Sequence, residues 1–337
     1  METLFIGYDN GLVRALVNGQ VDAAWALEGD APVAQIAVDP LAHERMYAAT
    51  LGAGLWRSDD AGRTFARLSG IPNELVWSVA VSASDRNDGY GTVYAGTQPS
   101  ALYRSTDGGA TFEELTSVQE IPSLPEWSFP PAPDTHHVHQ ITLSIDEPDA
   151  VIFGVELGGV YYSADRGVTW SRTTADPDPH TLRTHPDVPG RLYEGGGASY
   201  HESRDGGCSW TRGSFDGIPD DVRYFYSLAA DAGDAATVLI SGARDPFSGH
   251  GNITGVPVWS SVYRSSGNGW IEVADGLPAP DGTAMGALAA GSPGVFYYVT
   301  DPGEVYRSAD GGRTFAQLEY SNDVRGGIAR TVLAVPE

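Results

Sequence analysis

An eight-residue pattern recurs along the chain and constrains its fold more than any other feature. Each copy has a serine at its first position, an aspartate at its third, a glycine at its fifth, a threonine or serine at its seventh and an aromatic residue at its eighth. The complete copies are Ser58–Phe65, Ser105–Phe112, Ser163–Trp170, Ser203–Trp210 and Ser308–Phe315, and Ser265–Trp270 is a degenerate copy. Because the copies begin roughly 40 to 60 residues apart, the sequence predicts a repeat architecture.

The residue types in the pattern suit a tight turn between two antiparallel strands. Aspartate accepts hydrogen bonds from backbone N–H groups, glycine adopts a positive φ, and the aromatic residue starts the next strand and packs inward. The pattern resembles the Asp-box, or bacterial neuraminidase repeat, of sialidases, sortilin-type receptors, tandem-propeller xyloglucanases and photosystem assembly factors. The resemblance implies an all-β propeller with structural aspartates. It implies no particular activity, because these families share the motif and differ in function.

The spacing predicts a seven-bladed β-propeller that occupies residues 1–337 as a single domain. Six complete blades are expected to start near Pro32, Leu75, Val138, His180, Phe225 and Ala284. The N-terminal region supplies three strands of the remaining blade, at Leu4–Tyr8, Gly11–Leu16 and Val21–Leu27. We expect Ile328–Val335 to add the innermost strand of that blade, which closes the ring and removes an exposed edge.

The resemblance does not extend to the catalytic parts of the better-known families. A typical sialidase has six blades and a Phe/Tyr-Arg-Ile-Pro segment near its start, and this chain has neither feature. The tandem-propeller xyloglucanases form their cleft with a second propeller, which the 337 residues do not contain. No catalytic residue is therefore carried over from either family.

The net charge of the chain limits the classes of molecule that it is expected to bind. The chain has 44 acidic residues, 20 basic residues and a formal net charge of −24, and none of the basic residues is lysine. Such a surface repels nucleic acids and anionic membranes. No apolar run is long enough to span a membrane, and the N-terminus lacks a basic stretch followed by an apolar one. We therefore expect a soluble, cytoplasmic protein, and the acidity indicates a salt-rich cytoplasm or a GC-rich genome more than an acidic docking surface.

Two long insertions indicate which face carries the function. In a four-stranded blade, the loop between the second and third strands and the connection to the next blade emerge on one face, which we call the top face. The insertions at residues 115–134 and 243–259 both belong to it. Long loops in compact domains are usually functional.

Histidines gather at this face. The chain has 8 histidines, and three of them occur together as His136, His137 and His139 at the start of one innermost strand. His180 and Tyr226 take the equivalent place in the next two blades, and Glu156 lies in a turn on the same face. We expect these side chains to converge at the top of the axial channel.

The candidate roles follow from residue chemistry. The candidate catalytic residues are His139, His180, Glu156, Tyr226 and Arg223. The candidate metal ligands are His137, His139, His180 and His250, which suit zinc, manganese, copper or iron. The candidate substrate-binding residues are Trp127, Glu126, Arg244, Asp245 and Arg330.

Several functions remain open at this point. The cluster fits a small-molecule or glycan site, with a metal-assisted hydrolase or lyase as one form and metal-free acid–base catalysis as another. A glycoside hydrolase would use two of the carboxylates Glu126, Asp134, Glu156 and Asp245. Alternatively, the histidines are structural, and the protein is a non-catalytic scaffold that binds a protein partner.

Overall fold

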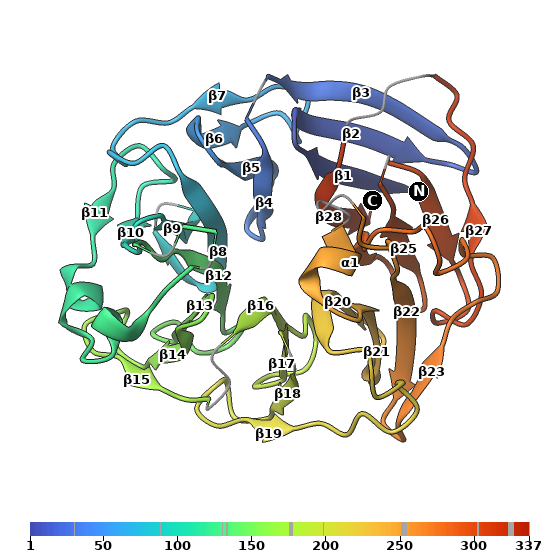
Figure 1. Ribbon diagram of the computed structural model, residues 1–337. Coiled ribbons are helices and arrows are strands. Elements are labelled where there is room, and N and C mark those ends of the chain that lie inside the picture. The colour runs from blue at the N-terminus through green and yellow to red at the C-terminus, as the bar shows by residue number, and fades with distance from the viewer. Residues whose placement is uncertain are drawn as a thin grey trace.

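Seven four-stranded antiparallel sheets surround a central axis in the computed structural model of the protein (Figure 1). The structure describes residues 1–29, 31–87, 89–129, 131–132, 134–174, 178–197, 199–250, 255–301, 303–322 and 327–336. Each sheet is one blade, with its first strand nearest the axis. The predicted seven-bladed, all-β propeller is confirmed.

The strands follow the chain in the order that the repeat predicts. The blade that contains both ends of the chain has the order β28 (Ala329–Pro336), β1 (Glu2–Tyr8), β2 (Gly11–Val17) and β3 (Val21–Glu28). The next three blades, each from the axis outward, are β4 (Val33–Asp39), β5 (Ala42–Thr50), β6 (Gly54–Ser58) and β7 (Ala66–Arg67); β8 (Val76–Asn87), β9 (Tyr90–Thr97), β10 (Leu102–Ser105) and β11 (Glu113–Glu114); and β12 (Val138–Leu143), β13 (Val151–Val155), β14 (Gly159–Ser163) and β15 (Ser171–Arg172).

Three further blades complete the ring. They are β16 (Pro179–Thr184), β17 (Leu192–Gly196), β18 (Tyr200–Ser203) and β19 (Thr211–Arg212); β20 (Tyr224–Asp231), β21 (Asp234–Ala243), β22 (Ser261–Ser266) and β23 (Trp270–Glu272); and β24 (Ala287–Ala290), β25 (Phe296–Val299), β26 (Val305–Ser308) and β27 (Ala316–Gln317). The core lies between the blades, where apolar side chains of neighbouring sheets pack together.

The C-terminal strand closes the ring as predicted. Strand β28 pairs with β1 in antiparallel register from Glu2 opposite Pro336 to Tyr8 opposite Ala329. Ala329, Val332 and Ala334 of β28 are buried. The closing strand therefore removes the edge of β1 and adds apolar surface to the core.

The Asp-box hairpins use their polar groups internally. In the copy at Ser163–Trp170, Asp165 accepts hydrogen bonds from the Thr169 N–H at 2.8 Å and the Thr169 hydroxyl at 2.6 Å. The Ser163 hydroxyl donates to Asp165 at 2.7 Å and accepts from the N–H of Gly167, whose φ of +85° favours glycine. These contacts support the interpretation of the aspartates as structural.

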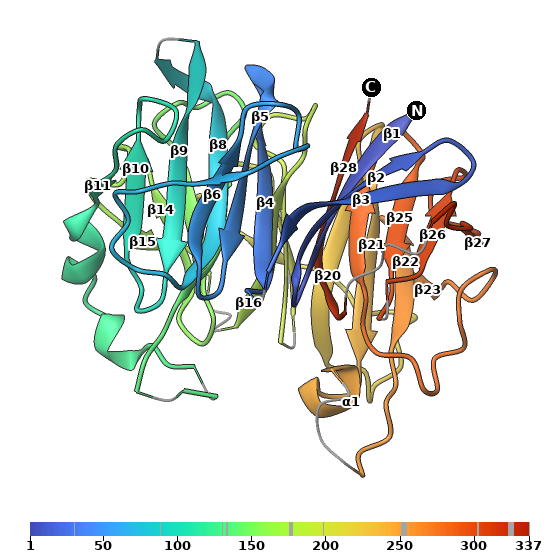
Figure 2. The same ribbon diagram turned by 90° about the horizontal axis from the view of Figure 1, so that it is seen from above.

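Both insertions lie at the same end of the blades, as Figure 2 shows. The first contains the 3₁₀ helices η1 (Thr116–Glu120) and η2 (Leu124–Glu126), and the second contains the short helix α1 (Pro246–His250). Residues 130, 133 and 251–254 of the insertions lie outside the described residues. No helix among the described residues is long and apolar enough to cross a membrane.

Candidate functional site

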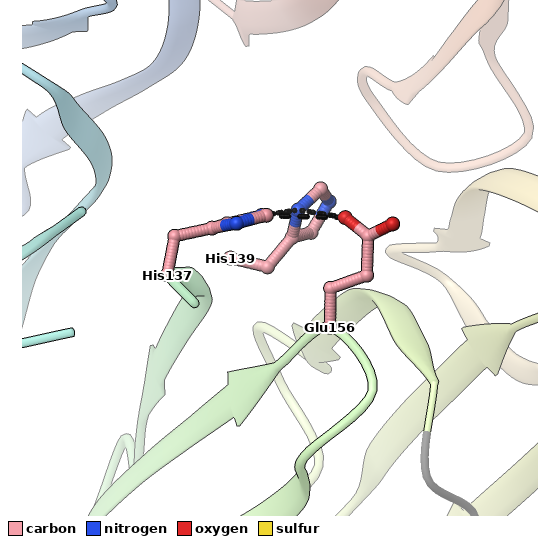
Figure 3. A group of neighbouring side chains, drawn as sticks. All are labelled: His137, His139 and Glu156. Carbon is pink, nitrogen blue, oxygen red and sulfur yellow. Dashed lines mark hydrogen bonds and ion pairs between the residues drawn. The ribbon is translucent and has the colours of Figure 1, made fainter. Parts of the chain in front are cut away.

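Three potential metal ligands converge at the top of the axial channel, where strand β12 begins and strand β13 ends (Figure 3). His137 Nε2 lies 3.0 Å from His139 Nδ1 and 3.3 Å from Glu156 Oε2. His139 Nδ1 lies 3.7 Å from the same Glu156 oxygen. We call His137, His139 and Glu156 the donor triad.

The histidines of the triad are neutral near neutral pH. The His137 side chain is fully buried, and that of His139 is 13% exposed. Burial, with a smaller effect of neighbouring histidines, lowers the pKa of each imidazole to about 3. Both rings therefore have a nitrogen lone pair available to a metal ion, since no proton has to be displaced from an imidazolium.

Aromatic contacts fix the orientation of His137. Its ring stacks on Trp77 of β8 at a centroid distance of 3.7 Å, and Phe129 meets it edge-on at 4.6 Å. His137 Nδ1 is buried without a hydrogen-bond partner among the described residues. Ring packing, rather than a hydrogen bond at Nδ1, therefore directs Nε2 toward His139 and Glu156.

A second group adjoins the donor triad. His180 Nδ1 donates to the backbone carbonyl of Phe225 at 2.7 Å, and Nε2 lies 3.3 Å from Asp178. Burial opposes protonation of His180, but the hydrogen bond and the charge of Asp178 outweigh it and raise the pKa of His180 to about 9. Donor atoms of Glu156, Asp178 and His180 also lie within 4.8 Å of one another. His180 is thus a buried imidazolium beside the triad, at a ring centroid distance of 5.9 Å from His139.

Two tyrosines and a third blade complete the cluster. The Tyr224 hydroxyl is 3.0 Å from His250 Nε2, and the Tyr226 ring packs edge-on against the His250 ring at 5.0 Å. Burial lowers the pKa of His250 to about 4 and raises the pKa of Tyr226 above its usual range. Helix α1 therefore brings a neutral histidine over the start of β20.

A polar pocket leads from the cluster along the axis. Its lining includes His139, His180, Tyr226 and two arginines, Arg183 of β16 and Arg330 of β28. Arg330 forms an ion pair with Asp9. Arg183 Nη1 donates at 3.0 Å both to Gln140 Oε1 and to the backbone carbonyl of Leu182, and burial lowers the pKa of Arg183 to about 10.

A sequence-family model identifies one of the blade hairpins as an Asp-box repeat. The model of the BNR/Asp-box repeat matches residues 161–172, which include one of the hairpins described above. The chain is an Asp-box β-propeller. A search of curated protein sequences finds no match.

Solved structures share the propeller fold at low sequence identity. The Asp-box propeller aligns with the GH74 xyloglucanase of Xanthomonas campestris at a TM-score of 0.61 and 18% identity, covering 85% of this chain and 45% of that chain. The GH74 enzyme of Niastella koreensis gives a TM-score of 0.63 and 14% identity, with coverages of 97% and 51%. The structure of YCF48 bound to D1 peptide gives 0.60 and 15%, with coverages of 85% and 82%. The chain thus spans about half the length of the two GH74 chains and most of that of YCF48.

The Asp-box propeller brings six of the predicted site residues together. They are His137, His139, Glu156, His180, Tyr226 and His250. Arg330 lines the pocket below them. Their meeting follows from the strand order, because each lies on an innermost strand or a top-face loop of neighbouring blades.

Other predicted residues lie apart from this cluster. Trp127 is 5% exposed, and its indole N–H donates to Tyr161 at 2.8 Å, so its ring belongs to the core rather than to a sugar-binding surface. Arg244 pairs with Asp221 at 3.0 Å, and Asp245 accepts hydrogen bonds from the first N–H groups of α1. Glu126, Asp134 and Arg223 are exposed on the described surface. Of the four carboxylates expected for glycoside hydrolysis, Glu156 is the one that the structure places in the cluster.

Four further residues of the site were not found from the sequence: Trp77, Asp178, Arg183 and Tyr224. Asp178 stands in a linker that is rich in Asp and Pro, and Tyr224 precedes the expected start of its strand by one residue. Arg183 is three residues beyond His180, and a β-bulge between Pro179 and Thr181 interrupts the alternation of that strand. The sequence feature that could have indicated Arg183 is that it is a basic residue on an innermost strand.

The spacing of the donor triad suits a metal ion. Two ligand atoms that each lie about 2.1 Å from one ion are about 3.0 to 3.4 Å apart in octahedral or tetrahedral geometry. The His137–His139 and His137–Glu156 distances, 3.0 and 3.3 Å, fall within this range, and the His139–Glu156 distance of 3.7 Å is slightly longer. Two imidazoles and one carboxylate on one side of an ion leave positions open for water or substrate.

Proposed function

We propose that the protein binds a divalent transition metal ion through His137, His139 and Glu156 and acts as a metal-assisted hydrolase or lyase on a small molecule or glycan in the axial pocket. The proposal depends mainly on one observation: the three donor atoms lie 3.0, 3.3 and 3.7 Å from one another at the mouth of a polar pocket. Zinc, manganese, copper and iron accept this mixture of imidazole and carboxylate ligands.

The neighbouring residues support a chemical role beyond metal binding. An ion at the triad would polarise a bound carbonyl or activate a water molecule. His180 is protonated at a raised pKa of about 9 and lies beside Asp178, and Tyr226 lines the same pocket. These two side chains are suited to donate a proton to a leaving group or to stabilise negative charge that develops on the substrate.

Elemental analysis of the purified, untagged protein after incubation with each metal and gel filtration tests the proposal. We expect close to one metal ion per chain in the wild type and loss of that ion in His137→Ala/His139→Ala. Because His137 is buried, Glu156→Gln provides a milder variant that keeps the shape of the side chain and removes its charge. His43→Ala changes an exposed histidine and serves as the control. Equal metal content in wild type and Glu156→Gln, or none in the wild type, would contradict the proposal.

A non-catalytic scaffold is the second candidate. The chain shares the propeller fold with YCF48, whose structure was solved with bound D1 peptide. A scaffold would retain a protein partner in pull-down experiments when His139 is replaced by alanine. A catalyst would lose turnover in that variant without a fall in its melting temperature.

A further inference from the structure

The axial pocket differs in charge from the rest of the molecule. The chain has a net charge of −24, yet no aspartate or glutamate belongs to the described lining of the pocket. The lining instead contains two arginines, Arg183 and Arg330. An anion that enters therefore meets positive charge inside a molecule whose surface is strongly acidic.

Arg183 is the more available of the two arginines. Arg330 is paired with Asp9, whereas no acidic side chain among the described residues forms an ion pair with Arg183. The Arg183 side chain is half-buried in the pocket, so solvent screens its charge only in part and no counterion among the described residues offsets it. The group remains charged in the protein, so a ligand anion would supply the missing partner.

The contacts of Arg183 also fix its orientation. Nη1 is occupied by Gln140 Oε1 and the carbonyl of Leu182, both at 3.0 Å. Gln140 Oε1 in turn accepts a hydrogen bond from Gln35 at 3.3 Å, so side chains of three blades form one network. Nε and Nη2 of Arg183 donate no hydrogen bond to any of the described residues. That edge of the guanidinium has the fork geometry that binds a carboxylate through two parallel hydrogen bonds.

We propose that Arg183 forms a carboxylate-binding subsite in the axial pocket, so that the ligand of the protein is a small organic acid or an acidic sugar. Tyr226 and Ser227, which also line the pocket, bear hydroxyl groups that are suited to the rest of such a ligand. The inference deepens the proposed function by naming the substrate class. The subsite itself does not require the metal, because Arg183 is not a member of the donor triad.

Calorimetric titration of metal-free protein tests the subsite. The probes are glucuronate and malonate, with glucose as the neutral counterpart of glucuronate, in protein stripped of metal by a chelator. We expect at least one of the two acids to bind and glucose not to bind. Arg183→Gln should weaken binding of the acid by about tenfold or more, because a charged hydrogen-bonding partner is lost. Arg183→Lys keeps the positive charge but lacks the planar pair of donors, so its affinity for the acid should lie between those of the wild type and Arg183→Gln.

Control variants separate this inference from the proposed function. Arg204→Gln, which alters an arginine whose side chain is 80% exposed, should bind the acids like the wild type. Arg183→Gln should still bind metal, and Glu156→Gln should still bind the acids. If Glu156→Gln still binds metal while Arg183→Gln no longer binds the acids, the carboxylate subsite is supported and the proposed metal site is contradicted. Binding of glucose as tight as that of glucuronate, failure of both acids to bind, or unchanged binding of the acids in a folded Arg183→Gln would overturn the subsite.

Discussion

At the scale of single residues, the site depends on how His137 is held. A metal-ligating histidine normally donates its second N–H group to an acceptor, which fixes the ring. His137 lacks such a partner among the described residues and instead lies against Trp77, whose own indole N–H donates to Gln98 at 2.8 Å. The stacking contact therefore has the orienting role that a hydrogen bond has elsewhere.

This arrangement predicts the effect of removing the indole. If the donor triad binds the proposed metal ion, Trp77→Ala should weaken that binding by about tenfold, as loss of an orienting contact typically does, although the triad itself is unchanged. Competition with a chromogenic chelator measures the affinity. Trp56→Ala is a matched control, because Trp56 is also half-buried and has one hydrogen bond, to Ala53 at 3.1 Å, but lies outside the cluster. Equal affinities in the two variants would show that stacking does not position His137.

Sequence reasoning found the residues that strand order alone could place. His139, His180 and Tyr226 occupy equivalent positions on three successive innermost strands, so the repeat was sufficient to bring them together. Trp77 takes the corresponding bulge position of β8, between Val76 and Ser78, so the same alignment could have placed it in the channel. Its stacking on His137, in contrast, depends on side-chain rotamers in two blades. Trp127 shows the opposite case: its loop lies on the predicted face, but the ring turns into the core.

At the scale of the element, the Asp-box hairpin is a hydrogen-bonded unit whose stability depends on an ionised aspartate. Hydrogen bonds from the Thr169 hydroxyl and N–H, and then from Ser163, hold the pKa of Asp165 at about 2. In three other copies, burial is the largest single effect and raises the pKa, but several hydrogen bonds together outweigh it and also give a pKa of about 2, at Asp60, Asp107 and Asp310. The motif predicted this element from sequence because all its partners lie within eight residues.

These values predict the direction of acid sensitivity. The ordinary pKa of aspartate is 3.8, so each lowered pKa stabilises the fold above about pH 4 and the effect disappears as the pH falls toward 2. The free energy of unfolding, measured by urea titration at several pH values, should therefore fall between pH 4 and 2. Asp165→Asn removes one titrating group and should make that fall shallower. An identical pH dependence in the variant would contradict the linkage, and Asp220→Asn, which changes an exposed aspartate outside the hairpin, is the control.

At the scale of the whole molecule, the ring requires both ends of the chain. Six blades are continuous in sequence, but the seventh combines β1, β2 and β3 with β28, which lies more than three hundred positions further along the chain. Long-range pairing of this kind carries an entropic cost of loop closure, and in return it covers the inner edge of β1. The closure was predictable because the N-terminal region offered three strands where every other blade has four.

Deletion of residues 328–337 tests how far the molecule depends on this strand. The deletion removes the pairing of β28 with β1 and the burial of Ala329, Val332 and Ala334, and it exposes Leu4 and Ile6 of β1 along an unpaired edge. Blades in a closed ring support one another, so we expect the sharp thermal transition of the full chain to be replaced by a broad one with increased aggregation. Arg330 would also be lost from the axial pocket, so binding of glucuronate and malonate should weaken together with the fold. Removal of Glu337 alone is the control, and a deletion variant that melts as sharply as the full chain would show that the propeller does not need closure.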